Sequence, residues 1–407
     1  MAYSNKPFII PIFLPHAGCP HRCVFCNQTL ITGVNSRISD RSGFKTSDQV
    51  QGQGAGRSRK RSIHGYVSTY RRPVLHPIPK NQMRIPLRGA TQPLGLRWGF
   101  ETTSIQVRST VESFLKYKSA RRGIVQIAFF GGNFLGIDID EIKRMLSEAA
   151  VFVKAGRVNS IRFSTRPDTI DRSRLDIIKN FPVSTVELGV QSMDDRALVN
   201  TNRGHTSADT QKAVRRLKEF NYEIGVQLMV GLPGDDPGRL FASARRVAEL
   251  KPDFIRIYPT VVVAGSPLAT LYKAGRYRPL PLKDAVTRVK ELYRFFSRKK
   301  IQVIRMGLQA TDDLEKGSTI LAGPYHPSFG HLVYSEIFLD KAISAIETVN
   351  PKGSAVTLHV HPRSVSKMSG LKNVNITRLN KKFPLQSVEI VSDHSLKEDQ
   401  LAVTTSL

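Results

Sequence analysis

The sequence predicts an α/β fold, a partial (β/α)6 barrel of the TIM type followed by a small α+β appendage. Short apolar or β-branched runs alternate with amphipathic stretches, which is typical of βα units around a parallel sheet. Turn residues follow the expected strand ends, as in Gly131-Gly132 and Gly231-Leu232-Pro233-Gly234. After about residue 305 the alternation changes, which indicates where the barrel ends.

Six strands and six helices are expected in turn. The strands are expected at 8–14, 124–130, 160–164, 185–190, 223–230 and 253–258. The helices are expected near 104–118, 139–154, 171–180, 207–220, 238–250 and 282–299. Six such units make an incomplete barrel, and barrels of this type carry their active sites at the carboxyl ends of the strands.

The barrel is expected to be interrupted by an insert. Residues 1–33 supply the first strand and a cysteine-containing loop, and residues 101–350 supply the remainder of the barrel. Residues 34–100 contain 13 Lys or Arg against two acids and show no sustained period of 2 or 3.6. Such a stretch is predicted to be an irregular, basic and disordered insert.

Residues 351–407 are expected to form the appendage, after a helix near 331–348. Apolar and polar residues alternate at 354–361, which predicts a strand. A polar helical stretch follows near 363–382, and a second strand is expected at 387–391. The tail beyond Asp393 is polar and is expected to fray.

Composition limits the class of protein. The 407 residues are 40% apolar, which is enough for a substantial core, and carry a net charge of +28. The insert contributes +11 of this charge, so the other 340 residues still carry +17. This excess favours a polyanionic partner, with nucleic acid ahead of a membrane surface, although a merely solvated basic surface is the alternative.

Neither a membrane span nor a secretory signal is expected. No apolar run approaches the roughly 18 residues of a spanning helix. The apolar stretch from Phe8 to Leu14 contains Pro11 and lacks a small-residue cleavage site. Three cysteines cannot close a disulfide framework, so a reducing, cytoplasmic location is predicted.

The three cysteines form the most specific motif. Cys19, Cys23 and Cys26 have the spacing C-x3-C-x2-C, which lets three thiolates converge from one loop. Thiolates are the usual ligands of iron–sulfur clusters, and three of them leave one iron of a four-iron cluster open. A zinc site completed by His16 or His21 is the rival hypothesis, but zinc usually requires a second ligand pair that this chain lacks.

This motif, on the loop after the first strand, resembles the radical S-adenosylmethionine (SAM) superfamily. The resemblance spans residues 8–31 and about 120–348. It is greatest to the radical domain of the Elongator catalytic subunit and its stand-alone bacterial relatives that lack the acetyltransferase domain, and weaker to oxygen-independent coproporphyrinogen oxidases. The motifs that carry it are Val186–Ser192, Arg203–Thr206, Met229–Gly234 and Ala322–Pro327.

The resemblance implies a chemistry. In the family, three cysteines hold a 4Fe–4S cluster whose fourth iron is chelated by the amino and carboxylate groups of SAM. One-electron reduction cleaves SAM and releases a 5′-deoxyadenosyl radical, and the electron comes from a donor such as a flavodoxin or ferredoxin. No acetyltransferase pattern follows residue 350, so acetyl transfer is not expected of these residues.

The resemblance also implies cofactor-binding residues. Gly131, Gly132 and Asn133 correspond to the motif that receives the SAM amino group, although its third position is often acidic. Arg203 corresponds to the residue that binds the SAM carboxylate, and its planar guanidinium group can donate two parallel hydrogen bonds to a carboxylate. Gln191 would contact the ribose or methionine part. The further expected contacts are Ser164 and Gln227 at the ribose and the turn from Gly231 to Gly234 at the adenine.

Each of these residues also has a purely structural interpretation. The glycine pairs are common turn residues, and Arg203 could cap a helix. Glu187 lies among apolar residues, so it either pairs with a base such as Arg162 or belongs to the site. Tyr325 and His326 are either substrate contacts or parts of a rigid loop.

The appendage contains Gly370-Leu371-Lys372-Asn373 within a run of basic residues. This segment resembles the G-x-x-G loop with which KH modules clamp single-stranded RNA, with Asn373 in place of the second glycine. A packing or dimerisation element is the alternative.

Three functional hypotheses follow. The first is a radical SAM enzyme that modifies RNA such as tRNA. The second is an RNA-binding protein whose cluster is structural or senses redox state. The third is a radical SAM enzyme that acts on a small molecule or a tetrapyrrole.

Overall fold

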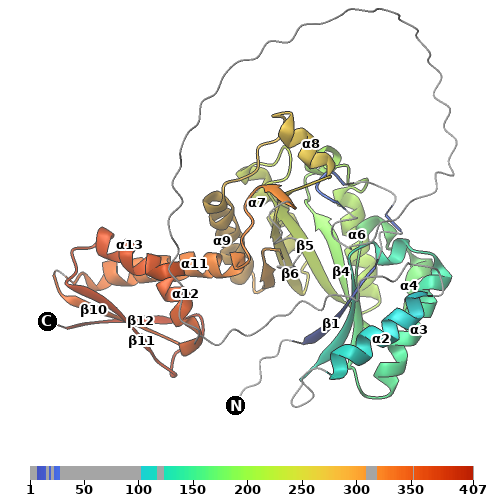
Figure 1. The fold of residues 1–407 in the computed structure, drawn as a ribbon, viewed down its shortest axis with the longest axis horizontal. Helices are drawn as coiled ribbons and strands as arrows, with labels where there is room; N and C mark the ends of the chain where they lie inside the picture. The colour runs from blue at the N-terminus through green and yellow to red at the C-terminus, as the bar shows by residue number, and fades with distance from the viewer. Residues whose placement is uncertain are drawn as a thin grey trace, which may run out of the picture. The chain divides into compact units, whose positions relative to one another are not determined.

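A computed structural model shows the fold (Figure 1). It describes residues 7–14, 18, 19, 23–27, 102–116, 123–308, 319–351 and 353–406. The predicted insert at 34–100 lies outside these ranges, as do His16 and His21.

A parallel sheet of seven strands forms the body of the fold. Its spatial order follows the chain, and each strand pairs in parallel with its neighbour. The strands are β1 (Phe8–Phe13), β2 (Val125–Phe130), β3 (Ser160–Thr165), β4 (Val183–Gln191), β5 (Glu223–Val230), β6 (Phe254–Pro259) and β8 (Gln302–Met306). The six expected strands are confirmed as a curved, open barrel, and β8 is a seventh strand that the sequence analysis did not predict.

Helices connect the strands as expected. They are α2 (Thr102–Lys116), α3 (Ile139–Lys154), α4 (Arg172–Ile178), α6 (Ser207–Glu219), α7 (Pro237–Glu249) and α9 (Leu282–Arg298), with the shorter α5 (Asp195–Asn200) and α8 (Pro267–Lys273). Polar caps define several of the starts. The Asp138 carboxylate accepts hydrogen bonds from two amides of α3, and Thr206 and Asp209 form a capping box at α6.

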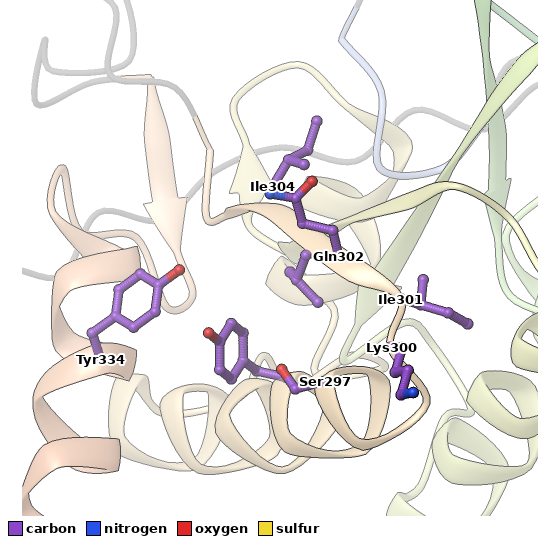
Figure 2. A pocket seen from close by; sticks show the side chains of 8 residues that line it. Ser297, Lys300, Ile301, Gln302, Ile304 and Tyr334 are labelled. Carbon is purple, nitrogen blue, oxygen red and sulfur yellow. The ribbon is translucent and has the colours of Figure 1, made fainter. Parts of the chain in front are cut away.

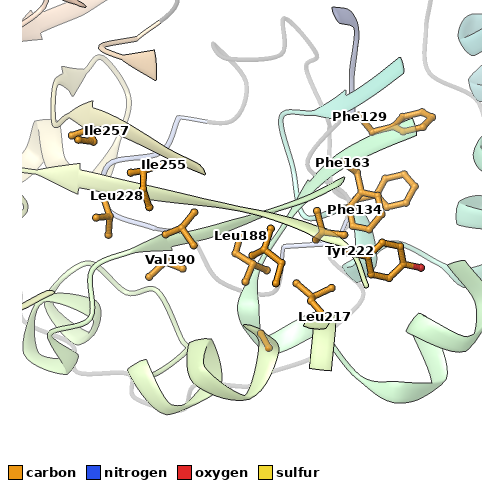
Figure 3. Packing of buried hydrophobic residues seen from close by; sticks show 14 of the residues in the cluster. Phe129, Phe134, Phe163, Leu188, Val190, Leu217, Tyr222, Leu228, Ile255 and Ile257 are labelled. Atoms are coloured by element: carbon orange, nitrogen blue, oxygen red, sulfur yellow. The ribbon is translucent and has the colours of Figure 1, made fainter. Parts of the chain in front are cut away.

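The main core lies between the sheet and these helices. Phe134 stacks on Phe129 and Phe163 with ring centroids 5.0 and 4.6 Å apart, and all three rings are fully buried (Figure 3). Phe129 and Phe163 face each other across β2 and β3 in register, and Phe134 follows in the 3-10 turn Phe134–Gly136. This stack fixes the chain directly after the end of β2.

The opposite, inner face of the sheet is polar. Glu187 is fully buried there and forms ion pairs with Arg162 at 2.6 Å and with Arg256 at 2.7 Å. Arg162 also donates to the Gln126 side chain at 3.0 Å. Of the two alternatives for Glu187, the structure shows the pairing with Arg162. The two arginines leave the triad with a net positive charge.

The appendage has its own core. Its mixed sheet has β10 (Ala355–Val360) at the centre, parallel to β11 (Ser387–Ser392) and antiparallel to β12 (Leu401–Ser406). Helices α12 (Val365–Ser369) and α13 (Val374–Lys382) accompany this sheet. The expectation of a frayed tail was wrong, because Leu401 and Val403 pack against the appendage core and order the last strand.

Helix α11 (Phe329–Val349) contributes to both cores. Phe329, Val333 and Ile337 belong to the barrel core, whereas Phe338 and Ile346 belong to the appendage core. Among the described residues, no helix is both long and apolar enough to cross a bilayer.

The buried triad predicts a large effect of one substitution. Glu187→Gln should lower the free energy of unfolding by about 3–5 kcal/mol, because it leaves two buried guanidinium groups without their carboxylate. Chemical denaturation would measure this loss. Glu112→Gln is the matched control, since Glu112 pairs with Arg157 on the surface and should leave stability nearly unchanged. Equal effects of the two substitutions would contradict the prediction.

Candidate active site

The predicted site residues converge at the carboxyl ends of the first strands. The cysteine loop follows β1, Asn133 follows β2, Thr165 ends β3 and Gln191 ends β4. Parallel strands present their carboxyl ends at one edge of the sheet, so these four segments meet there.

Backbone hydrogen bonds attach the cysteine loop to the barrel. The Val24 amide donates to the Thr201 carbonyl at 3.1 Å, and the Val24 carbonyl accepts from the Leu268 amide at 2.7 Å. Val24 and Phe25 pack against a small core that includes Leu268 of α8. The aromatic residue of the motif therefore anchors the loop, with its side chain in that small core.

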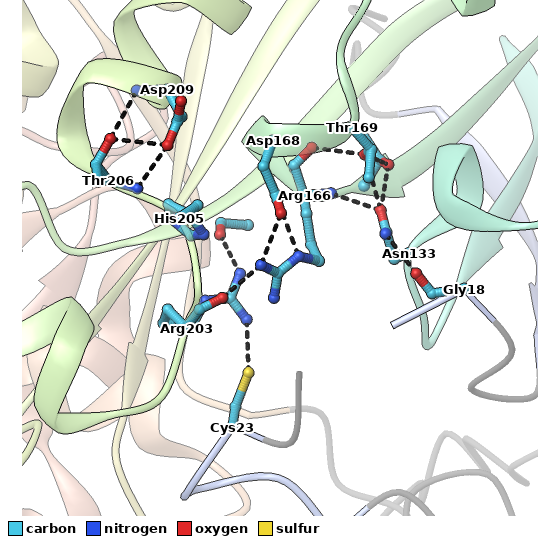
Figure 4. A network of polar contacts seen from close by, with 12 residues as sticks. Gly18, Cys23, Asn133, Arg166, Asp168, Thr169, Arg203, His205, Thr206 and Asp209 are labelled. Atoms are coloured by element: carbon cyan, nitrogen blue, oxygen red, sulfur yellow. Dashed lines mark hydrogen bonds and ion pairs between the residues drawn. The ribbon is translucent and has the colours of Figure 1, made fainter. Parts of the chain in front are cut away.

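The cysteines lie in a partly buried environment. Cys23 is 6% exposed, and its Sγ accepts a hydrogen bond from Arg203 Nη1 at 3.1 Å (Figure 4). Burial raises the pKa of the Cys19 thiol, and burial together with Cys23 and Cys19 raises the pKa of Cys26 to about 12. The neighbouring cysteines thus add to burial in opposing ionisation of the Cys26 thiol. A bound cationic centre such as iron would act in the opposite direction, because metal coordination deprotonates a thiol.

Asn133 connects the cysteine loop to β3. Its fully buried amide donates from Nδ2 to the Gly18 carbonyl at 2.7 Å. Its Oδ1 accepts from the Thr165 hydroxyl at 2.7 Å, and from the Arg166 amide and the Thr169 hydroxyl, both at 3.0 Å (Figure 4). Both polar atoms of the side chain are therefore bonded to protein groups.

Glycines permit close backbone approach at this edge. Gly18 and Gly131 have φ values of +96° and +97°, which side-chain-bearing residues rarely adopt. A Cβ at Gly18 would lie 2.7 Å from the Gly136 carbonyl carbon, and one at Gly131 would lie 3.2 Å from the Leu14 carbonyl oxygen. Gly132 follows, half-buried. The glycine pair therefore allows the chain after β2 to pass close to the chain after β1.

Arg203 and Gln191 lie beside the cysteines. Arg203 is 7% exposed and donates from Nη2 to the Gly189 carbonyl at 2.6 Å, in addition to its bond to Cys23. Gln191 has a left-handed φ of +67°, and the pairing of β4 with β5 shifts register just before it. Such a distortion redirects a side chain and is common near active sites. A Cβ at Gly189 would lie 3.0 Å from the Gln191 amide nitrogen and 3.4 Å from Arg203 Nη2.

The remaining predicted residues lie on β3, on β5, in the turn after β5 and in the loop before α11. Ser164 and Gln227 are on its inner face and partly exposed. Gly231, with a φ of +82°, begins the turn after β5, and its carbonyl accepts from the Tyr277 hydroxyl at 2.7 Å. His326 Nδ1 accepts from the Ser328 amide at 3.0 Å at the start of α11, which favours the rigid-loop interpretation of that histidine.

Sequence reasoning missed Arg166. Arg166 is 3% exposed, forms an ion pair with Asp168 at 2.9 Å and donates to the Arg203 carbonyl. An arginine at the end of a buried strand was the available signal, because a buried cation requires a partner.

The residues present fit the predicted cofactors. Among the described residues, Ser164 Oγ, Gln191 Oε1, Arg203 Nε and Arg166 Nη1 are buried side-chain atoms without a hydrogen-bond partner. Buried polar atoms are nearly always satisfied, so these four are available to a polar ligand. SAM offers an amino group, a carboxylate and a ribose to such donors and acceptors. The described residues include no group of three or more His, Cys, Asp or Glu placed for a single metal ion, so the cluster ligands stay a prediction.

A separate pocket of about 350 Å³ lies beside the edge strand β8 (Figure 2). It is lined by Tyr293 and Ser297 of α9, residues 300–304 and Tyr334 of α11. None of the predicted cofactor-binding residues lines it, so it is distinct from the site at the cysteine loop.

Two family models match the chain. One is described as the Radical SAM superfamily and matches residues 13–247. The other is described as the Radical_SAM C-terminal domain and matches residues 252–338. The first alone covers more than half of the chain.

Several known proteins are similar over parts of their length. The tRNA uridine(34) acetyltransferase of Methanocaldococcus jannaschii is 29% identical over 47% of this chain and 39% of its own length. Elongator complex protein 3 of Saccharomyces cerevisiae is 32% identical over 38% of this chain and 28% of its own. Protein YhcC of Escherichia coli is 26% identical over 43% of this chain and 56% of its own. The chain therefore spans well under two thirds of these relatives.

A solved structure shares the fold. The archaeal Methanocaldococcus infernus Elp3 with an N-terminal deletion superposes with a TM-score of 0.50 at 23% identity, over 60% of each chain.

The Asn133 contacts predict which substitutions release the cysteine loop. Asn133→Asp keeps an acceptor for the Thr165, Arg166 and Thr169 donors but places a second acceptor opposite the Gly18 carbonyl. It should lower the iron retained after anaerobic reconstitution more than the exposed control Asn380→Asp does. Asn133→Ala loses all four contacts and should also lower the free energy of unfolding by about 1–3 kcal/mol. Full iron content in both Asn133 variants would show that the loop is held by other contacts.

His205 predicts a pH dependence of stability. Burial and then the neighbouring Arg203 and Arg166 lower its pKa from 6.5 to about 4. The folded state therefore keeps this imidazole neutral, whereas the unfolded state protonates it, so stability is lost as pH falls from about 6.5 towards 4. Between pH 7.5 and 5.5 the loss should be about 1.4 kcal/mol. Denaturation of His205→Gln at both pH values should show a correspondingly smaller decrease, and an unchanged decrease would refute the assignment.

Proposed function

The chain belongs to the radical SAM superfamily, a family of enzymes that use a 4Fe–4S cluster and SAM, and on that premise we propose that it modifies an RNA such as tRNA. The family assignment rests on the match over residues 13–247 and confirms the resemblance that the cysteine motif predicted. The RNA substrate is the proposal. It is supported by the similarity to a tRNA uridine(34) acetyltransferase and by the net charge of +28.

The proposed cluster ligands are Cys19, Cys23 and Cys26. When bound, the cluster and SAM supply a one-electron cleavage that yields a 5′-deoxyadenosyl radical. Arg203 has a distinct task, because it donates a hydrogen bond from Nη1 to Cys23 Sγ at 3.1 Å and so places a cation beside a proposed cluster ligand. Hydrogen bonds to sulfur also adjust the potential at which such a centre is reduced.

The unpartnered atoms define the proposed SAM contacts. Arg203 Nε and Arg166 Nη1 are donors suited to the carboxylate of SAM, and Gln191 Oε1 and Ser164 Oγ can accept from its amino or hydroxyl groups. Gly131 and Gly132 would let the backbone after β2 approach the amino group, and Gln227 and Gly231 would lie at the nucleoside. Asn133 would act by positioning Gly18 at the start of the cysteine loop, because its side chain has no free atom.

The proposal includes a partner and a location. Three cysteines provide ligands for a single cluster, so the electron would come from a separate donor such as a flavodoxin or ferredoxin. A cluster held by cysteine thiolates requires a reducing compartment, so the proposed location of the protein is the cytoplasm.

Anaerobic reconstitution tests the radical chemistry. The reduced protein should convert SAM to 5′-deoxyadenosine, and Cys23→Ala should lower this rate at least about 100-fold because it removes one of the three cluster ligands. Ser297→Ala, a substitution in the pocket beside β8, is the control and should leave the rate unchanged. Addition of bulk tRNA should raise the yield or produce a modified nucleoside detectable by mass spectrometry.

The outcomes separate the three hypotheses. Iron bound without any SAM cleavage would favour an RNA-binding protein with a structural or redox-sensing cluster. Cleavage that is indifferent to tRNA, with no nucleoside modified, would favour a small-molecule or tetrapyrrole substrate. Bound zinc in place of iron would overturn the assignment of the cysteines.

A further inference from the structure

We propose that the loop 370–373 and the exposed side of α13 form a surface that binds the phosphate backbone of single-stranded RNA. This surface, called the basic face below, comprises Gly370, Leu371, Lys372, Asn373, Val374 and Lys381. The inference rests on the proposed function and adds where the RNA would be held, apart from the cofactor site.

Charge is segregated within the appendage. Residues 363–382 contain six Lys or Arg and no Asp or Glu. Arg363, Arg378 and Lys382 form ion pairs with Glu398, Glu336 and Glu347, all of which come from other segments. Lys367 lies over the Tyr334 ring and donates to the Ser364 hydroxyl. Among the described residues Lys372 and Lys381 have no acidic partner, and both are exposed. Two cations thus remain available to an external anion.

One of these cations lies on the exposed side of a helix, and the other lies in the loop before it. Val374, Arg378 and Lys381 follow the spacing i, i+4, i+7 on α13, which places them on one face, and all three are exposed. Lys372 lies two residues before the helix begins. A phosphate backbone that contacts both unpaired lysines would therefore run from the loop along this face of α13.

The loop has an unusual backbone. Gly370, Lys372 and Asn373 have φ values of +71°, +53° and +58°. Asn373 thus takes the left-handed conformation that a second glycine of a G-x-x-G loop would favour, and asparagine tolerates it. The replacement of that glycine therefore does not prevent the loop from forming.

Buried contacts hold the loop in place. Asn375 is fully buried, and its Nδ2 donates to the Ser335 carbonyl and hydroxyl, both at 3.0 Å, and to the Met368 carbonyl at 2.9 Å. A Cβ at Gly370 would lie 2.8 Å from the Ser335 hydroxyl and 2.9 Å from Val374 Cγ1. The loop is thus packed against α11 before any partner binds, which lowers the entropy lost on binding.

Apolar side chains flank the charged loop residues. Leu371 and Val374 are 42% and 43% exposed on either side of Lys372 and Asn373. Exposed aliphatic groups beside a cation suit a ligand with alternating charged and flat apolar parts, which describes a single strand with unstacked bases. A duplex would present mainly phosphates and offer the apolar groups no contact.

The test uses the full-length protein and a labelled, unstructured 20-nucleotide RNA. Lys372→Gln with Lys381→Gln should weaken binding roughly tenfold near 100 mM salt. It should also lower the slope of log affinity against log salt by about 1.4, because each phosphate contact on a single strand contributes about 0.7. The matched control is Lys300→Gln with Lys397→Gln, which removes two lysines outside the basic face and should change affinity less than twofold.

Each result has a distinct meaning. If the wild-type protein binds the RNA and the Lys372/Lys381 variant binds equally well, the basic face is wrong while the proposed RNA function survives. If the wild-type protein binds neither this RNA nor tRNA, the RNA substrate itself is wrong. In the absence of RNA, both double variants should cleave SAM at the same rate. A loss of this cleavage in the Lys372/Lys381 variant alone would show that these lysines support the cofactor chemistry and not RNA binding.

Discussion

The amide of Asn133 is the contact on which the geometry of the site depends. The described residues of the loop that carries the three cysteines belong to no strand, so hydrogen bonds to neighbouring segments fix their position. Asn133 supplies the bond at Gly18, while Val24 supplies two backbone bonds on the other side of Cys23. Asn133 itself is fixed from both directions, by three donors after β3 and by the buried ring of Phe134 next to it in the chain. The aromatic core and the cysteine loop are therefore coupled through one residue, and full burial keeps water from competing for its bonds.

One group of cations explains two opposite titration effects. Arg166 and Arg203 favour the thiolate of Cys19, although burial raises its pKa more than they lower it. The same two arginines act with burial to keep His205 neutral. Their positive charge thus favours anions and disfavours a further cation at this edge of the sheet. Cysteine thiolates and the carboxylate of SAM are anionic groups, so this positive charge favours both of them at this edge of the sheet.

The sequence predicted the features that depend on strong local patterns. Apolar strands buried on one face and capped helices were placed within a few residues, because their periodicity and cap residues are local signals. The strand β8, Gln302–Met306, was missed because it is a short edge strand of mixed polarity. Asn133 was expected as a cofactor contact through its motif, but its four hydrogen bonds depend on segments 115 residues before and up to 36 residues after it. No local pattern records such contacts, and the same holds for the donation from Arg166 to the Arg203 carbonyl, which joins residues 37 positions apart.

The two cores explain how a remote surface can serve the chemistry. Contacts to an unreacting part of a substrate contribute to catalysis only if they fix the reacting part, so the intervening structure must be stiff. Helix α11 meets this requirement, because Phe329 and Val333 are buried in the barrel core while Leu339 and Ile346 are buried in the appendage core. Its residue Ser335 also accepts the hydrogen bonds that hold the loop 370–373. A single continuous helix therefore connects the basic face to the barrel core.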